Sequence, residues 1–160
     1  MKYGIISDIH GNIEALKTCL SYLKGRVSSY IFPGDLVGYG PCPNECGEAV
    51  RELEVSYGGA DRIKVIAGNH DLAAAGLKDV SGFTPAAKKA IFWTRDALKP
   101  GNREYIGRLK SRLDTPAFTV AHGSPRDPVD EYLLDGPAMK ENLSCFEAKV
   151  CFVGHSHIPI

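Results

Sequence analysis

Five short apolar runs, with little polar alternation inside them, divide this chain of 160 residues. They are Lys2–Ser7, Ser29–Pro33, Ile63–Ala67, Phe118–Ala121 and Val150–Val153. All are brief, and β-branched and aromatic residues are frequent in them. Runs of this kind are typical of strands that are buried on both faces of a sheet.

Amphipathic segments with a helical period lie between the apolar runs. Four helices are expected: Ile13–Leu23 after an N-cap at Asn12, Pro43 to about Leu53, one that starts at Thr84-Pro85, and one through Tyr105–Leu113 after Pro100-Gly101. Strands that alternate with helices predict an α/β fold, in which a parallel-rich sheet is covered by helices on both faces. We find no linker or internal repeat, so residues 1–160 are expected to form one domain.

Each apolar run ends in a turn that carries side chains able to bind a metal. The carboxyl ends of strands border the binding crevice in open α/β sheets, so these turns should converge. The histidines of the chain all lie in them: His10, His70, His122, His155 and His157. A lone histidine after a strand is more often structural. Histidines that all stand beside Asp, Asn or Gly in such turns instead favour a metal site.

The ordered set of these motifs resembles the calcineurin-like metallophosphoesterases. The set is Asp8-Ile9-His10, Gly34-Asp35, Gly68-Asn69-His70-Asp71, His122-Gly123 and Gly154-His155-Ser156-His157. The stretches 34–41 and 122–128 look like a bacterial branch of that family, described as phosphodiesterases or as diadenosine-tetraphosphatase-related. The resemblance covers essentially the whole chain and implies the layered fold of the family. Relatives usually continue with several more strands, so the fold is expected to be truncated at the C-terminus.

The resemblance also implies a centre that holds two divalent metal ions. Asp8, His10 and His157 would hold one ion, Asn69, His122 and His155 the other, and Asp35 would bridge both as part of the catalytic machinery. Such mixed donors suit borderline metals; manganese is favoured, with iron, zinc and nickel as alternatives. A hydroxide bridging the two metals would attack phosphorus. His70 would stabilise the transition state or protonate the leaving oxygen.

Two residues outside the ligand set are candidates for substrate binding. Asn12 could touch a phosphate at a helix N-terminus, and Arg126 could clamp a second phosphate or a nucleotide. The alternatives are a plain helix cap for Asn12 and an exposed loop residue for Arg126. Two neighbours of the motifs are equally open: Tyr39 could stack on a base or pack in its loop, and Asp71 could orient His70, cap a helix or be solvated.

Composition narrows the partners of the chain. Lysine plus arginine and aspartate plus glutamate both number 19, which argues against a nucleic-acid partner and favours a small phosphate-ester or nucleotide substrate. No signal peptide or membrane-length apolar run is present, and the cysteines lack disulfide spacing, so a cytoplasmic protein without membrane contact is predicted. A strand edge left open near the C-terminus would also permit a homo-oligomer.

Two alternatives to an enzyme of small phosphoesters were weighed. A non-catalytic scaffold on the same fold typically loses ligand histidines, whereas this chain keeps each of them. Serine/threonine protein phosphatases carry Asp-Arg-Gly soon after the bridging aspartate, where this chain reads Val37-Gly38-Tyr39. The sequence therefore predicts a metal-dependent phosphodiesterase or nucleotide phosphohydrolase.

Overall fold

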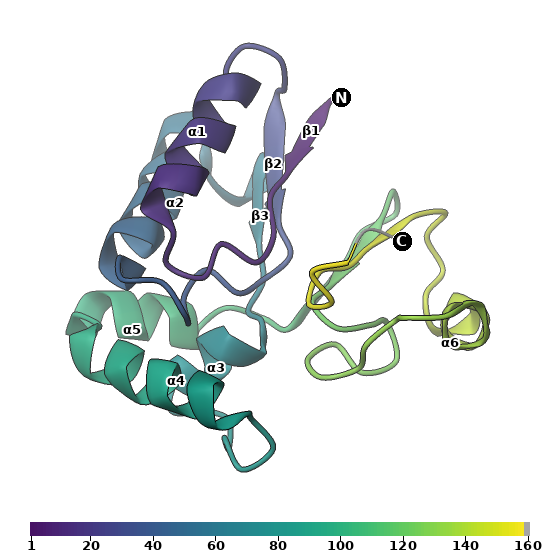
Figure 1. Cartoon of the computed structure of the whole chain (residues 1–160). Coiled ribbons are helices and arrows are strands. Elements are labelled where there is room, and N and C mark those ends of the chain that lie inside the picture. The colour runs from purple at the N-terminus through teal and green to yellow at the C-terminus, as the bar shows by residue number, and fades with distance from the viewer. Residues whose placement is uncertain (159–160) are drawn as a thin grey trace.

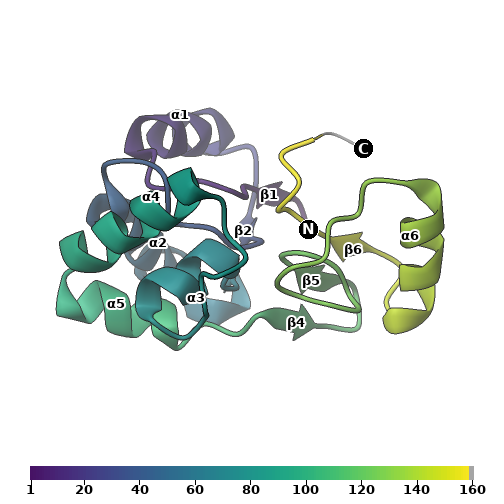
Figure 2. The same cartoon turned by 60° about the horizontal axis from the view of Figure 1, so that its bottom comes forward.

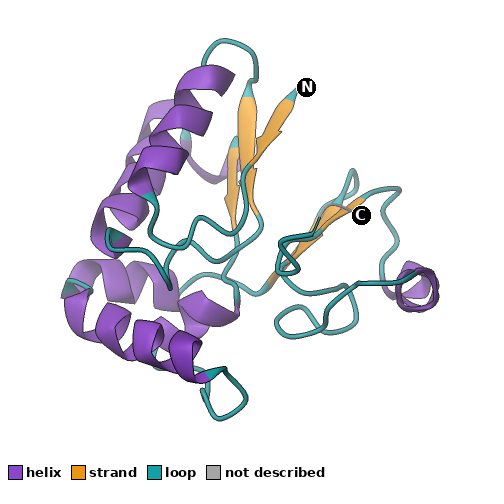
Figure 3. Ribbon diagram, viewed as in Figure 1, coloured by secondary structure: helices purple, strands orange, loops and turns teal. Residues whose placement is uncertain are grey.

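The computed structural model describes residues 1–158. Its strands are β1 (Tyr3–Ile5), β2 (Ser29–Phe32), β3 (Ile63–Val65), β4 (Arg112–Asp114), β5 (Thr119–Ala121) and β6 (Cys151–Phe152). Its α-helices are α1 (Ile13–Leu23), α2 (Pro43–Tyr57), α3 (Asn69–Ala75), α4 (Pro85–Ala97), α5 (Pro100–Gly107) and α6 (Gly136–Asn142). Each of the five predicted apolar runs contains a strand. Figure 3 shows that the strands form two separate groups.

The first sheet, in the order β1-β2-β3, is parallel throughout and carries α1 and α2 on one face (Figure 1). Its middle strand β2 is buried along its whole length. Tyr30 and Phe32 share the larger hydrophobic core with Leu16 of α1 and Val50 of α2. Ile31, between them, belongs to a second core. Because successive side chains of a strand point to opposite faces, both faces of this sheet are covered.

A second sheet covers the other face. Strand β5 pairs antiparallel with β4 and parallel with β6. Phe118 and Val120 pack against Ile31 and Ile66, which closes the second core between the sheets. Figure 2 shows this sheet beside the first, with α6 at its outer side. The parallel-rich, layered core flanked by helices is therefore confirmed, but the face expected to carry helices is covered by strands instead.

The predicted helix over Tyr105–Leu113 is wrong. Helix α5 begins at Pro100 and ends at Gly107, and Leu113 lies in β4, where it pairs with Val120. The short helices α3 and α6 were not predicted. Helix α1 has the predicted bounds, and the Asn12 side chain caps it by accepting a hydrogen bond from the Ala15 N–H at 3.0 Å.

Within residues 1–158, no helix combines the length and apolar content that a membrane crossing requires. The cysteines are all free thiols, as the absence of a disulfide spacing predicted.

Candidate metal centre

The turns after five strands converge at one end of the two sheets. Those after β1, β2 and β3 come from the first sheet, and those after β5 and β6 come from the second. The predicted ligands on these turns are Asp8, His10, Asp35, Asn69, His122, His155 and His157. All are buried except Asp8, which is half-buried, and His157, which is exposed. The site thus lies where the two layers meet, and neither sheet holds all of it.

The backbone of these turns adopts a conformation that side chains disfavour. In the described part of the chain, positive φ angles at residues other than glycine occur at Asp8 (55°), His10 (49°), Asp35 (53°), His155 (68°) and His157 (55°). Each such residue costs of order 1–3 kcal/mol and persists only where the surroundings hold it in place. All five are predicted ligands, so the strain is confined to the candidate centre.

The first group of donors consists of Asp8, His10 and His157. The Nε2 atoms of His10 and His157 are 3.1 Å apart, and Asp8 Oδ1 lies 3.2 Å from His157 Nε2. Asp8 Oδ1 also lies 4.0 Å from His10 Nε2. Two imidazole nitrogens and a carboxylate oxygen that face one another this closely form a donor set suited to a cation.

The second group adjoins the first through Asp35. His122 Nε2 lies 3.1 Å from Asn69 Oδ1 and 3.3 Å from Asp35 Oδ2. The same Asp35 oxygen lies 3.6 Å from His10 Nε2, in the first group. His155 joins through its ring, whose centroid is 4.9 Å from that of His122. Asp35 therefore lies between the two groups, as a bridging carboxylate would.

Three of the histidines have one ring nitrogen fixed by a backbone carbonyl. His122 Nδ1 donates to Pro33 O at 2.9 Å, and His10 Nδ1 donates to Val37 O at 3.3 Å. His155 Nε2 donates to Asp130 O at 3.2 Å. A carbonyl only accepts, so each ring carries its proton there and keeps a lone pair on the other nitrogen. Metal-binding histidines are held in this way, and the residues present therefore fit a metal.

Glycines leave room for the ligand carboxylates. A Cβ on Gly68 would collide with Asp35 Oδ1 and lie 2.7 Å from the Asp35 backbone nitrogen. A Cβ on Gly154 would lie 2.6 Å from Asp8 Oδ2. Both carboxylates are thus packed against backbone that only glycine provides.

Burial and mutual charge perturb the titration of the second group. Burial lowers the pKa of His122, but its hydrogen bond with Asp35 and the Asp35 charge outweigh burial and raise that pKa to about 9. Burial raises the pKa of Asp35, and the same bond and charge bring it below its ordinary value. The pair is therefore strongly attractive.

His70 lies beside both groups. It belongs to a cluster with His10 and Asp35, and its backbone N–H donates to Asp35 Oδ1 at 2.9 Å. Its Nδ1 is buried without a hydrogen-bond partner, and burial lowers its pKa to about 4. Unlike His10, His122 and His155, this ring is not fixed by a carbonyl.

Asp71 caps helix α3 and is fully buried. Its carboxylate accepts hydrogen bonds from the N–H groups of Gly68, at 3.1 Å, and Val37, at 3.0 Å. Burial raises its pKa to about 7. The capping alternative fits this geometry, and the solvated one does not. The cap also joins the turn after β3 to the turn after β2.

Arg126 and Asn12 are engaged elsewhere. Arg126 forms ion pairs with Glu131 and Glu141, and it lines neither of the cavities at the centre. Asn12 is exposed and serves as the cap of α1. Neither residue enters the substrate site proposed below.

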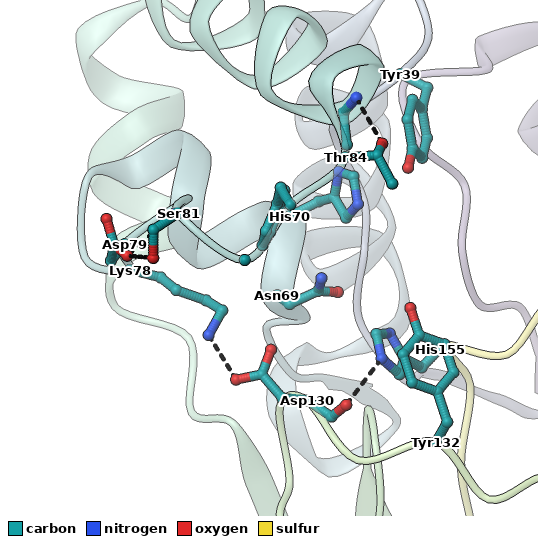
Figure 4. Close-up of a pocket in the computed structure, with 13 residues that line it drawn as sticks. Tyr39, Asn69, His70, Lys78, Asp79, Ser81, Thr84, Asp130, Tyr132 and His155 are labelled. Atoms are coloured by element: carbon teal, nitrogen blue, oxygen red, sulfur yellow. Dashed lines mark hydrogen bonds and ion pairs between the residues drawn. The ribbon is translucent and has the colours of Figure 1, made fainter.

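Two adjoining cavities open over the centre. The smaller, of about 220 Å³, contains His10, Asp35 and His157. The larger, of about 430 Å³, extends past Asn69 to Lys78 and Asp130 (Figure 4). Both are lined by Tyr39, His70, Tyr132 and His155. Sequence reasoning missed Lys78, Phe83, Asp130 and Tyr132, because they lie in loops without a motif.

Similarity to known proteins agrees with this geometry. The sequence matches the calcineurin-like phosphoesterase family over residues 1–159. An uncharacterised protein of Methanocaldococcus jannaschii is 34% identical over 162 residues, covering 98% of this chain and 62% of that protein. A metallophosphoesterase structure from Sphaerobacter thermophilus is 40% identical, with a TM-score of 0.82, covering 99% of this chain and 62% of that one.

A structure of a hypothetical protein from Pyrococcus horikoshii has the same fold. It is 22% identical with a TM-score of 0.83, and the match covers 99% of this chain and 71% of that one. The chain spans less than two thirds of the length of both the Methanocaldococcus and the Sphaerobacter proteins.

Proposed function

Since this chain belongs to the calcineurin-like phosphoesterase family, we propose that it is a metal-dependent hydrolase of phosphate esters. We propose further that its substrates are phosphodiesters or nucleotides. The observation that carries the proposal is the convergence of strained ligand turns from both sheets, with three histidines whose free nitrogens are set by backbone carbonyls.

The ligand assignment follows the two groups. Asp8, His10 and His157 would hold one divalent ion, Asn69, His122 and His155 a second, and Asp35 both. Imidazole, carboxylate and amide oxygen donors together suit manganese, iron, zinc or nickel, and manganese is the preferred assignment. When bound, such ions supply positive charge that activates a water molecule and neutralises phosphate oxygens.

The remaining residues position the reaction. His70 lines both cavities, so its imidazole is placed to stabilise charge on the phosphoryl group or to give a proton to the leaving oxygen. Asp35 Oδ1 holds the His70 backbone, and the rings of Tyr39 and Phe83 pack against its side chain. These contacts fix His70 close to the reacting phosphate.

The test is a substrate panel assayed on metal-stripped protein. Phosphomonoesters, phosphodiesters and dinucleoside polyphosphates are each assayed with manganese, iron, zinc and nickel added singly. We expect hydrolysis only after metal addition, with manganese most effective and diesters or nucleotides preferred over simple monoesters. Full turnover in excess chelator, or bound metal without turnover of any ester, would contradict the proposal.

A further inference from the structure

The larger cavity adjoins the candidate metal centre but is not needed to hold metal. It shares Tyr39, His70, Tyr132 and His155 with the smaller cavity, where His10 and Asp35 lie. A phosphate held at the ligands would therefore direct one of its ester oxygens into the larger space. That space is where the group leaving the phosphorus would lie.

The walls of this cavity nearest the centre are aromatic. The side chains of Tyr39 and Tyr132 are each 52% exposed, although both are large hydrophobic groups. Tyr132 stacks on His155 with ring centroids 3.8 Å apart, and Phe83 lies 5.0 Å from His70. Figure 4 shows Tyr39 and Tyr132 on the side of the cavity opposite Lys78 and Asp79. Exposed rings on the wall of a cavity are suited to stack against a planar ligand.

The opposite end of the cavity has no spare positive charge. Among the described residues, Lys78 is the one lysine or arginine in the lining, and its Nζ is 2.5 Å from Asp130 Oδ2. Asp79 adds a second carboxylate. Arg126 is paired with Glu131 and Glu141 away from the cavity. One carboxylate is thus left in excess, which disfavours further phosphate groups on the leaving side.

The size of the cavity limits the leaving group in the same way. Ligand pockets for small molecules occupy about 300–1,000 Å³, and this one, at about 430 Å³, lies at the low end. It suits one ring system with its sugar better than a polyphosphate chain that ends in another nucleoside.

We propose that the larger cavity binds the leaving group of the substrate, and that this group is an uncharged alcohol bearing a planar ring, such as a nucleoside. This inference rests on the proposed hydrolase function and narrows its substrate to diesters of a single phosphate. In the reaction the P–O bond to the alcohol breaks. Water gives its hydroxyl group to phosphorus and a proton to the leaving oxygen, so no other reactant is required.

The experiment compares three substrates on the metal-loaded protein. They are a deoxydinucleoside monophosphate, the methyl ester of the matching nucleoside monophosphate, and a dinucleoside tetraphosphate. The first two leave as alcohols and differ in the ring. We expect kcat/KM for the dinucleoside monophosphate to exceed that for the methyl ester by about 10-fold, the scale of one base–aromatic stack. The tetraphosphate should be the poorest substrate.

Variants of Tyr132 separate stacking from structural effects. Tyr132→Ala should bring the first two substrates to within about 2-fold of each other, while Tyr132→Phe should keep the preference. Tyr22→Ala, an exposed tyrosine on α1, is the matched control and should change nothing. Asp79→Asn should improve use of the tetraphosphate relative to the dinucleoside monophosphate, because it removes the excess charge.

The outcomes distinguish this inference from the proposed function. Failure of every substrate with every metal would reject the function itself. Hydrolysis with equal use of the methyl ester, preference for the tetraphosphate, or an equal loss on both diesters in Tyr132→Ala would leave the function standing and overturn the leaving-group site.

Discussion

At the scale of single residues, the contact between Gly68 and Asp35 is the most sensitive point of the centre. Gly68 has an ordinary φ of −96°, so its lack of a side chain matters only for space. A Cβ there would meet Asp35 Cγ and the Asp35 backbone nitrogen, both at 2.7 Å. The carboxylate that lies between the two donor groups therefore depends on the absence of one methyl group.

We accordingly predict that Gly68→Ala displaces Asp35 and removes most bound metal and turnover. Overpacking of this kind costs about 1–3 kcal/mol of stability, so the variant should still fold at room temperature. The matched control is Gly47→Ala on α2, where a Cβ meets nothing within 4 Å and should add roughly 0.5–1 kcal/mol. Metal content by elemental analysis checks the pair; normal metal content in Gly68→Ala would contradict the bridging position of Asp35.

A second residue-scale prediction concerns His70. His70→Gln should lower turnover by ~10²–10⁴-fold, the usual range for a positioned acid–base group. Metal content should stay near that of the unmodified chain, because no carbonyl fixes the His70 ring as it does the three candidate ligand rings. The loss should shrink for substrates with good leaving groups. If the variant instead loses a metal, His70 is a ligand and its cluster with His10 and Asp35 has to be reassigned.

At the scale of elements, one ion pair joins the loop between α3 and α4 to the loop between β5 and α6. Lys78 contributes from the first loop and Asp130 from the second. The Asp130 carbonyl also accepts the His155 Nε2–H at 3.2 Å. A side chain on the helical side of the molecule thereby reaches, through Asp130, a candidate ligand on the second sheet.

Lys78→Met should therefore weaken metal binding while leaving stability nearly unchanged. Partners behind a ligand change metal affinity by about 10–100-fold, and the lower end applies because Lys78 acts through Asp130. Lys99→Met is the matched control, since Lys99 pairs with Glu48 at 2.9 Å far from the centre. Calorimetric titration of metal into both stripped variants checks this. Equal affinities in the two would show that the ion pair has no role at the centre.

The elements that sequence predicted best are those with local signals. The Asn12 cap and the apolar stripe of α1 act within a few residues, so its bounds could be read directly. The segment around Leu113 could not be assigned in this way, because its strand depends on pairing with Val120 in another segment. The second sheet over Ile31 is likewise a product of tertiary packing, which periodicity does not report.

The same distinction applies to the candidate site. The predicted ligands follow strand ends, and the parallel order of β1-β2-β3 brings the first three turns together from topology alone. Tyr132 and Lys78 come from irregular loops, and their position depends on contacts with His155 and Asp130. No spacing rule connects those residues in sequence, so the walls of the larger cavity became visible only in the structure.

At the scale of the whole molecule, the centre draws ligands from both sheets, so bound metal should hold the layers together. A ligand present at 100 times its dissociation constant stabilises the native state by about 2.7 kcal/mol. For a domain of this size, that corresponds to roughly 5–10 °C in melting temperature. We predict a decrease of this order when chelator is added, restored by excess manganese. A melting temperature unaffected by chelator in protein shown to contain metal would contradict a centre shared by the two sheets.

The positive φ angles at Asp8, His10, Asp35, His155 and His157 bear on how such a chain responds to selection. Glycine adopts that backbone without cost, so substitution at any of these positions would relieve strain and make the fold firmer. A library screened for heat resistance alone would consequently tend to collect glycines there and discard the chemistry with them. Retention of aspartate and histidine on this backbone is therefore a signature of selection for what the site does, in opposition to selection for durability.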